Sequence, residues 1–189
     1  FGRSHLEWTN YVNSVNRSIV EAKDGRETSV AVNCANEYGM LSNGKSDGSA
    51  LGDGPTVAML GLVGAALHSG EVRDVCVVGL GTGITVGWLN QIESVKQVDV
   101  IELEQAVIDL AKYFKGVNFN ALASPKTHIV EGDAREVLVT RPKSYDLVVS
   151  EPSNIHRAGV ANLYTREFYT SVAARMNPEA LFCQWVQSY

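Results

Sequence analysis

The chain has 189 residues, of which 45% are hydrophobic and 20% charged, and a formal net charge of −5. This composition is typical of a globular domain with a sizeable core, and the absence of a Lys/Arg cluster argues against nucleic acid as a partner. Three widely spaced cysteines and four histidines without metal-ligand spacing predict a reducing, cytoplasmic setting and no metal site.

The first part of the chain predicts a small antiparallel β element. Residues 27–33 and 38–42 have strand character, and Asn43-Gly44 is the sequence of a two-residue hairpin turn. No clear pattern precedes them, and a glycine-rich stretch follows. We therefore expect a small N-terminal β-hairpin region over residues 1–54 and a larger domain over residues 55–189.

Pro55 opens a predicted helix that ends at Ser69-Gly70, because proline is favoured in the first turn of a helix. Large apolar residues recur at helical spacing, and we expect them to form the face that packs on the core. These residues are Met59, Leu60, Val63 and Leu67.

From residue 75 onward, short apolar runs alternate with amphipathic segments. The apolar runs predict strands at residues 75–78, 98–101, 127–130, 145–149 and 180–186. The segments between them predict helices at residues 84–92, 105–114, 134–139 and 166–176. This alternation predicts an α/β fold with a Rossmann-like parallel sheet of the class I methyltransferase type, covered by helices on both faces.

Three glycines, Gly79, Gly81 and Gly83, follow the first strand of this series. A strand, a tight glycine turn and a helix form the opening unit of a nucleotide-binding fold, in which free backbone N–H groups face the ligand. The third glycine comes one residue earlier than in the dinucleotide fingerprint. This spacing favours a nucleoside with an amino-acid-like tail over a pyrophosphate.

Polar side chains follow the next three strands, where open α/β sheets bind their ligands. Glu102 lies about 20 residues after the glycine loop, where a carboxylate accepts hydrogen bonds from ribose hydroxyls. Asp133 is placed to accept from an exocyclic amine such as adenine N6, to cap the next helix, or both. Glu151 and Asn154 would face the reacting end of the ligand. The predicted nucleoside contacts are Gly79, Leu80, Gly81, Gly83, Glu102, Leu103, Asp133 and Ala134, and the predicted catalytic residues are Glu151 and Asn154.

Several stretches between about residue 27 and residue 187 carry a family resemblance. They are residues 41–45, 52–61, 77–83, 99–104, 131–133, 149–154, 159–169 and 182–187. The glycine loop and its two acids occur in all class I methyltransferases, whereas Glu-Pro-Ser-Asn (151–154) and Thr-Arg-Glu-Phe-Tyr (165–169) are far more specific. On these motifs the chain resembles the spermidine synthase (polyamine aminopropyltransferase) family, in particular a bacterial branch that is often fused to a transporter-like membrane domain.

The resemblance implies decarboxylated S-adenosylmethionine as co-substrate, a small amine as acceptor and methylthioadenosine as product. It also exposes departures in the amine half of the site. Glu151 and Asn154 stand where the family has two aspartates, and Thr56 and Ala58 stand where it has a tyrosine and an acid. The nucleoside half is intact.

The family's sheet continues with two more strands. We therefore expect either a piece of a longer protein, with a membrane domain outside this chain, or a homo-oligomer in which a neighbouring chain completes the sheet. Three functions stay open on the sequence alone. They are an aminopropyltransferase with Glu151 as base, a methyltransferase that uses S-adenosylmethionine, and a non-catalytic nucleoside-sensing domain.

Overall fold

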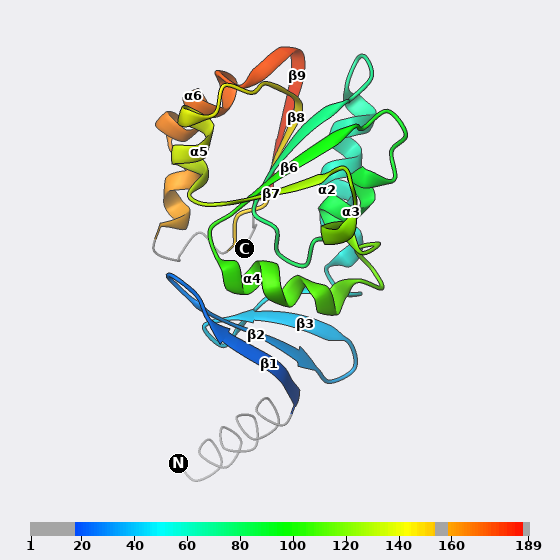
Figure 1. The fold of residues 1–189 in the computed structure, drawn as a ribbon, viewed down its shortest axis with the longest axis vertical. Coiled ribbons are helices and arrows are strands. Elements are labelled where there is room, and N and C mark those ends of the chain that lie inside the picture. Colours follow the sequence, from blue (N-terminus) through cyan, green and yellow to red (C-terminus); the bar gives the residue numbers. More distant parts are fainter. Residues whose placement is uncertain (1–17, 154–158, 187–189) are drawn as a thin grey trace.

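A computed structural model describes residues 18–153 and 159–186 of the chain, and Asn154 lies outside them. The described chain contains a small antiparallel sheet and a larger parallel sheet (Figure 1). The small sheet has the order β1-β2-β3-β4. Its strands are β1 (Ile19–Asp24), β2 (Ser29–Cys34), β3 (Tyr38–Ser42) and β4 (Lys45–Ser49).

The hairpin predicted at Asn43-Gly44 is confirmed. Both residues have positive φ, 49° and 76°, as a two-residue turn between right-twisted strands requires. A β-bulge follows in β4. Met40 pairs with Gly48 and Leu41 pairs with Ser46, so Asp47 is the extra residue. β1 lies in a segment that showed no clear pattern in the sequence.

The larger sheet confirms the predicted parallel α/β fold. Its five strands have the order β7-β6-β5-β8-β9, and every neighbouring pair is parallel. The strands are β5 (Asp74–Val78), β6 (Gln97–Glu102), β7 (Thr127–Glu131), β8 (Tyr145–Ser150) and β9 (Met176–Gln184).

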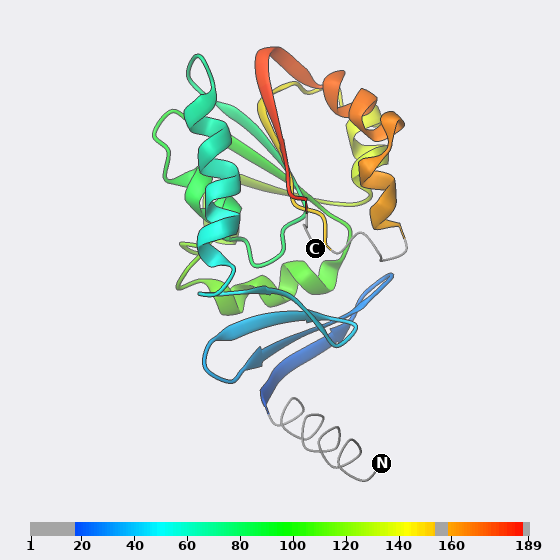
Figure 2. The same cartoon turned by 180° about the vertical axis from the view of Figure 1, so that it is seen from behind.

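Helices cover both faces of this sheet. The α-helices are α2 (Gly54–Leu67), α3 (Ile84–Asn90), α4 (Gln105–Leu110), α5 (Ala134–Thr140) and α6 (Arg166–Ala173). Short 3₁₀ helices are η1 (Ala111–Phe114), η2 (Ala121–Ala123) and η3 (Val160–Tyr164). Helices α2 and α3 lie on one face and α5 and α6 on the other, as Figure 2 shows from behind. Helix α4 lies between the larger sheet and the small one.

The small sheet shares a core with the larger sheet. Val30, Val32 and Met40 are almost completely buried and belong to the same apolar cluster as Leu110 of α4 and Phe114 of η1. The two sheets therefore pack through α4. The division of the chain at residues 54 and 55 stays a prediction.

The predicted core face of the first helix is wrong. Met59, Val63 and Leu67 of α2 are 52%, 40% and 72% exposed, whereas the buried positions include Gly61 and Gly64. Glycine lets the helix backbone approach its neighbours closely. A Cβ on Gly64 would lie 2.7 Å from a Leu147 methyl and from the Cys183 sulfur.

The end of the chain also departs from the prediction. Helix α6 ends at Ala173 rather than Met176, and β9 begins at Met176 rather than Ala180. Tyr145 pairs with Met176 but Leu147 pairs with Leu181, so the intervening residues form an irregularity that accommodates Pro178. In the described parts of the chain, no helix combines the length and apolar character that crossing a membrane needs.

Candidate functional site

The parallel register brings the predicted site residues to one edge of the larger sheet. Val78, at the end of β5, pairs with Ile101 of β6 and with Ser150 of β8. Glu102 pairs with Glu131 at the end of β7. The segments that follow these strands therefore meet at the carboxyl edge, where open α/β sheets bind ligands.

The glycine loop lies against the start of the segment after β8. Gly79 has φ of 91°, and a Cβ there would lie 2.7 Å from the carbonyl oxygen of Glu151. Gly83 also has positive φ, and a Cβ there would lie 3.0 Å from Nδ2 of Asn118. The loop therefore requires glycine for conformation and for space.

Asn118 holds the glycine loop by a hydrogen bond. Its side chain is buried and donates from Nδ2 to the carbonyl oxygens of Thr82 (2.9 Å) and Ala111 (3.2 Å). The backbone carbonyl oxygen of Asn118 lies so close to helix α3 that a Cβ on Gly87 would be 2.2 Å from it. Sequence reasoning missed Asn118, although a glycine within a helical pattern, such as Gly87, signals a close backbone approach.

Glu102 is buried and bound by backbone N–H groups. Leu80 of the glycine loop donates to its Oε2 at 2.8 Å, and Glu104 donates to its Oε1 at 2.9 Å. Burial raises the pKa of the Glu102 carboxyl, and these backbone hydrogen bonds oppose that shift. Each carboxylate oxygen can accept more than one hydrogen bond, so both can still accept from a ligand hydroxyl.

Asp133 caps helix α5, as one of its two predicted roles required. Its Oδ1 accepts from the backbone N–H of Arg135 at 2.9 Å, and its Oδ2 accepts from the Arg135 guanidinium at 2.5 Å. The hydrogen bond from Arg135 lowers the pKa of Asp133 below its usual value. A contact with an adenine amine stays a prediction. Beside these acids, Ala134 is buried and Leu103 is half-buried.

Glu151 begins the segment after β8 and faces the glycine loop. Its backbone N–H donates to the carbonyl oxygen of Val78 at 2.8 Å, and its Oε1 lies 3.8 Å from where a Cβ on Gly81 would stand. The Thr85 hydroxyl of helix α3 contacts its Oε2 at 2.7 Å. Burial, together with the negative charges of Asp47 and Glu102, raises the pKa of Glu151 to about 8, and the hydrogen bond from Thr85 opposes this shift.

Asp47 and Thr85 also lie at the candidate site, and sequence reasoning missed them. Asp47 is the bulged residue of β4, and the Ser42 hydroxyl donates to its Oδ2 at 2.7 Å. The next residue, Gly48, lies close to the glycine loop, since a Cβ there would be 3.2 Å from the Thr82 methyl. The small sheet therefore brings a carboxylate to the site, although nothing in the sequence around Asp47 signals this contact.

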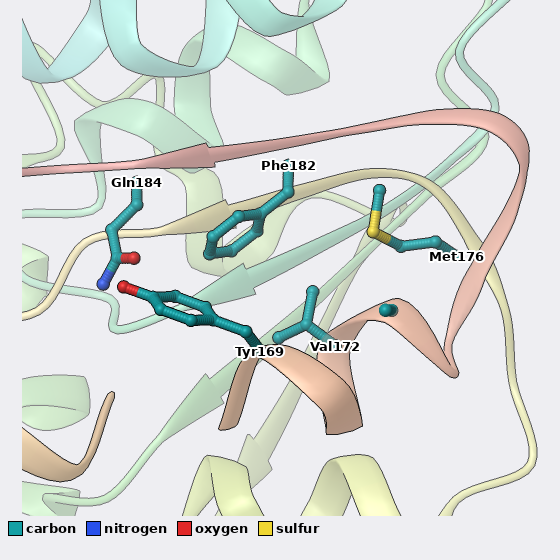
Figure 3. A pocket seen from close by; sticks show the side chains of 6 residues that line it. Tyr169, Val172, Met176, Phe182 and Gln184 are labelled. Atoms are coloured by element: carbon teal, nitrogen blue, oxygen red, sulfur yellow. The ribbon is translucent and has the colours of Figure 1, made fainter. Parts of the chain in front are cut away.

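Two open apolar grooves are lined by other residues and flank the edge strand β9. One is lined by the side chains of Tyr169, Val172, Ala173, Met176, Phe182 and Gln184, and Figure 3 shows all of them and labels all but Ala173. The other is lined by Thr56, Met59, Leu60, Val63, Cys183, Gln184 and Trp185. The candidate site is the acidic glycine-loop edge. The first groove is lined by none of the predicted site residues, whereas the second includes Thr56, at a position that the family resemblance places in the amine half of the site. Among the described residues, no group of three or more His, Cys, Asp or Glu side chains could hold a metal ion.

The glycine loop and the acid at the end of β6 are placed as in Rossmann-like folds of the methyltransferase type, which bind their ligands at this edge of the sheet. A family model described as "Spermine/spermidine synthase domain" matches residues 57–188, and the chain belongs to this family. The resemblance found in the motifs is thereby confirmed.

Curated relatives and solved structures agree with this assignment. The chain is 29% identical over 99 residues to a polyamine aminopropyltransferase of Alkaliphilus oremlandii, covering 52% of this chain and 34% of the relative. It is 32% identical over 124 residues to one of Mycobacterium tuberculosis, covering 64% and 24%. The chain thus spans about a third or less of these relatives.

Two solved structures share the fold. The first is a spermidine synthase in complex with the transition state analogue AdoDATO, with a TM-score of 0.81 at 19% identity, covering 88% of this chain and 57% of that one. The second is the spermidine synthase of Thermotoga maritima, with a TM-score of 0.76 at 19% identity, covering 88% and 55%.

Proposed function

We propose that the chain contains the nucleoside-binding site and the general base of an aminopropyltransferase. Such an enzyme transfers an aminopropyl group from decarboxylated S-adenosylmethionine to a small amine. The observation that carries this proposal is the Glu151 carboxyl, which faces the glycine loop and whose neighbouring charged groups, Asp47 and Glu102, are also acids. An acidic site suits a ligand that carries a sulfonium and an ammonium group.

The residues present fit this co-substrate. The glycine loop leaves space that a Cβ would fill, and Glu102 retains acceptor capacity for ribose hydroxyls. Asp133 and Ala134 follow β7, and in this proposal they lie beside the adenine. In this proposal Gly79, Leu80, Gly81, Gly83, Glu102, Leu103, Asp133 and Ala134 contact the nucleoside, and Glu151 and Asn154 face the amine.

Glu151 would act as the base. The acceptor arrives as an ammonium ion and must lose a proton before its nitrogen can attack carbon. The ionised Glu151 takes that proton, the amine nitrogen bonds to the carbon next to sulfur, and the carbon–sulfur bond breaks. The sulfonium becomes the neutral thioether of methylthioadenosine, and the product amine retains the positive charge.

The same acids disfavour the methyltransferase alternative. S-adenosylmethionine differs from its decarboxylated form by one carboxylate, which would meet the negative charges of Glu151 and Asp47. Among the described residues, the positive charges of Arg135 and Arg26 act on Asp133, whereas the charged groups that act on Glu151 are the acids Asp47 and Glu102. We therefore expect discrimination in favour of the decarboxylated co-substrate.

The test is a turnover assay that compares the two co-substrates with a panel of amines that includes putrescine and spermidine. Release of methylthioadenosine from decarboxylated S-adenosylmethionine, and no methyl transfer from S-adenosylmethionine, is the expected result. Glu151→Gln should lower the rate by about 10²–10⁴-fold, the usual contribution of a general base. Binding without turnover for every amine would favour the nucleoside-sensing alternative. Methyl transfer from S-adenosylmethionine would favour the methyltransferase alternative.

We also propose a cytoplasmic location, a homo-oligomeric state, no nucleic-acid partner and attachment to a membrane domain outside this chain. Three cysteines without a disulfide support the first, since Cys34, Cys76 and Cys183 are all free. Burial raises the pKa of Cys76 to about 12, so its thiol is inert at neutral pH.

A further inference from the structure

The hydroxyl of Thr85 lies between two oxygen atoms but has only one proton to donate. Its Oγ1 is 2.8 Å from the carbonyl oxygen of Val57 and 2.7 Å from Oε2 of Glu151. Both distances are typical of O–H···O hydrogen bonds. If Glu151 is ionised, Val57 and Glu151 are both acceptors, and one of the two contacts lacks a proton.

A proton on Glu151 satisfies both contacts. The Glu151 O–H then donates to the Thr85 oxygen, and the Thr85 hydroxyl donates to the Val57 carbonyl. The geometry at Thr85 thus favours the neutral carboxyl without reference to any charge.

The charged groups around Glu151 favour the same form. Asp47 from the bulge of β4 and Glu102 from the end of β6 both act on it as negative charges, and burial of the carboxyl disfavours its charged form. Helices α2 and α3 contribute a carbonyl oxygen and a hydroxyl at this point, and the glycine loop contributes backbone. Burial and the negative charges of Asp47 and Glu102 raise the pKa of Glu151 above its ordinary value of 4.5, whereas a Thr85 hydroxyl that donates to the ionised carboxylate lowers it.

We propose that Glu151 is protonated in the ligand-free protein and releases its proton to solvent when a sulfonium nucleoside binds at the glycine loop. A fixed positive charge beside the carboxyl favours its ionised form, whereas the neutral thioether of methylthioadenosine does not. This inference rests on the proposed function and extends it to the charge state of the ligand.

The proton balance of the reaction closes on this basis. Sulfonium binding converts Glu151 to the carboxylate, which can then accept a proton from the acceptor ammonium. After transfer, the sulfur is a neutral thioether and Glu151 again carries a proton. The protonated resting state therefore matches the product complex, and the co-substrate must bind before the base is active.

Isothermal titration calorimetry in buffers of different ionisation enthalpy measures the protons released on binding. At pH 7 the wild-type protein should release close to one proton per decarboxylated S-adenosylmethionine bound, because its Glu151 pKa of about 8 leaves most of the carboxyl protonated. Methylthioadenosine should release close to none. Glu151→Gln should abolish the difference between the ligands, whereas Glu93→Gln, at an exposed surface glutamate, should preserve it.

Asp47→Asn gives a graded test. Removing the neighbouring negative charge should lower the pKa of Glu151, so fewer protons are released at pH 7 while the nucleoside still binds. Equal proton release by both ligands, or release that persists in Glu151→Gln, would assign the proton elsewhere and overturn the inference.

Infrared difference spectra of ligand-free wild type and Glu151→Gln test the resting state directly. A protonated-carboxyl band at pH 6 that is absent from the variant is expected, and an ionised Glu151 at that pH would overturn the inference even if nucleosides bind. Failure of the wild type to bind either nucleoside would refute both this inference and the proposed function. Binding without proton release would refute this inference alone.

Discussion

Two glutamates at the carboxyl edge of the sheet have different surroundings and therefore different chemistry. Glu102 is held by the backbone N–H groups of Leu80 and Glu104, which stabilise the carboxylate as a fixed acceptor. Glu151 contacts the Thr85 hydroxyl, and the acids Asp47 and Glu102 raise the pKa of its carboxyl, which favours the protonated form. In the proposed function, Glu102 binds the ligand and Glu151 transfers the proton.

Glu102→Ala should weaken methylthioadenosine binding by about 1–3 kcal/mol, the usual range when a hydrogen-bonding partner is lost. Titration calorimetry measures the change, and Glu131→Ala, at an exposed acid that ends β7, is the matched control. Because Ala also leaves two backbone N–H groups without an acceptor, Glu102→Gln and thermal melting should accompany it. Unchanged affinity in both Glu102 variants would remove this residue from the nucleoside site.

Glu151→Gln should change stability in a pH-dependent way. The folded-state pKa of about 8 lies above the ordinary value of 4.5, so the folded protein binds the proton more tightly than the unfolded chain. Wild-type stability is therefore highest below pH 4.5 and falls as pH rises to about 8. Glutamine has no such proton to lose.

The variant should thus gain stability relative to wild type across this window. One pKa unit corresponds to about 1.4 kcal/mol, so the gain at pH 9 is a few kcal/mol at most and the difference at pH 4 is small. Urea denaturation at several pH values measures it. A difference between the two proteins that does not vary with pH would show that Glu151 has an ordinary pKa.

The sequence predicted the residues that follow strands but not those that reach the site from elsewhere. Glu102 and Glu151 were predictable because parallel strands end at a common edge. Asp47, Thr85 and Asn118 depend on packing between elements far apart in the chain, such as the 2.7 Å contact between Thr85 and Glu151. No local pattern encodes such contacts.

At the scale of elements, the β1–β2 turn is attached to the site by Glu104. The buried Glu104 carboxylate, at the start of α4, accepts from the backbone N–H groups of Arg26 (2.5 Å) and Glu27 (2.7 Å). Gly25 is required here, since a Cβ would lie 2.1 Å from Glu104 Oε2. The positive charge of Arg26 in turn lowers the pKa of Asp133, which indicates that the turn lies near the proposed adenine side of the site.

Glu104→Ala should release this turn, because two N–H groups lose a charged acceptor and such hydrogen bonds contribute about 1.5–3 kcal/mol each. We expect faster amide exchange and faster trypsin cleavage at Arg26, together with weaker nucleoside binding. The control is Asp109→Asn, which removes the ion pair between Lys23 and the same helix but leaves the turn's backbone bonds intact. Equal exchange in wild type and Glu104→Ala would contradict the role of Glu104.

The succession of elements was predictable, but the packing face of α2 was not. Apolar periodicity correctly predicted the strand–helix alternation because buried parallel strands are almost entirely apolar. In α2 the same periodicity pointed to Met59, Val63 and Leu67, whereas the helix packs through its small residues. Close approach at Gly61 and Gly64 outweighs the burial of larger side chains on this helix.

At the scale of the whole molecule, β9 is the least covered part of the larger sheet. It is the last strand in the sheet order, with β8 as its neighbour among the described strands, and all of its residues are half-buried or exposed. An apolar groove lies on each side of it. Tyr169 and Phe182 contact each other edge-to-face in one (Figure 3), and Met59 and Val63 line the other. Sheet edges of this kind are usually paired or covered, because their backbone N–H and C=O groups and apolar side chains otherwise face water.

We predict that the chain studied alone self-associates through this edge, as a dimer or larger oligomer. Val63→Glu should weaken association, because it introduces a charge into the α2 groove, where Val63 is 40% exposed. Val139→Glu is the matched control, since Val139 is 61% exposed on α5 and lines neither of the two grooves. Light scattering over a range of concentrations should show a larger mass for wild type and Val139→Glu than for Val63→Glu. A monomer at high concentration in all three proteins would contradict the prediction, and an oligomer unaffected by Val63→Glu would place the interface elsewhere.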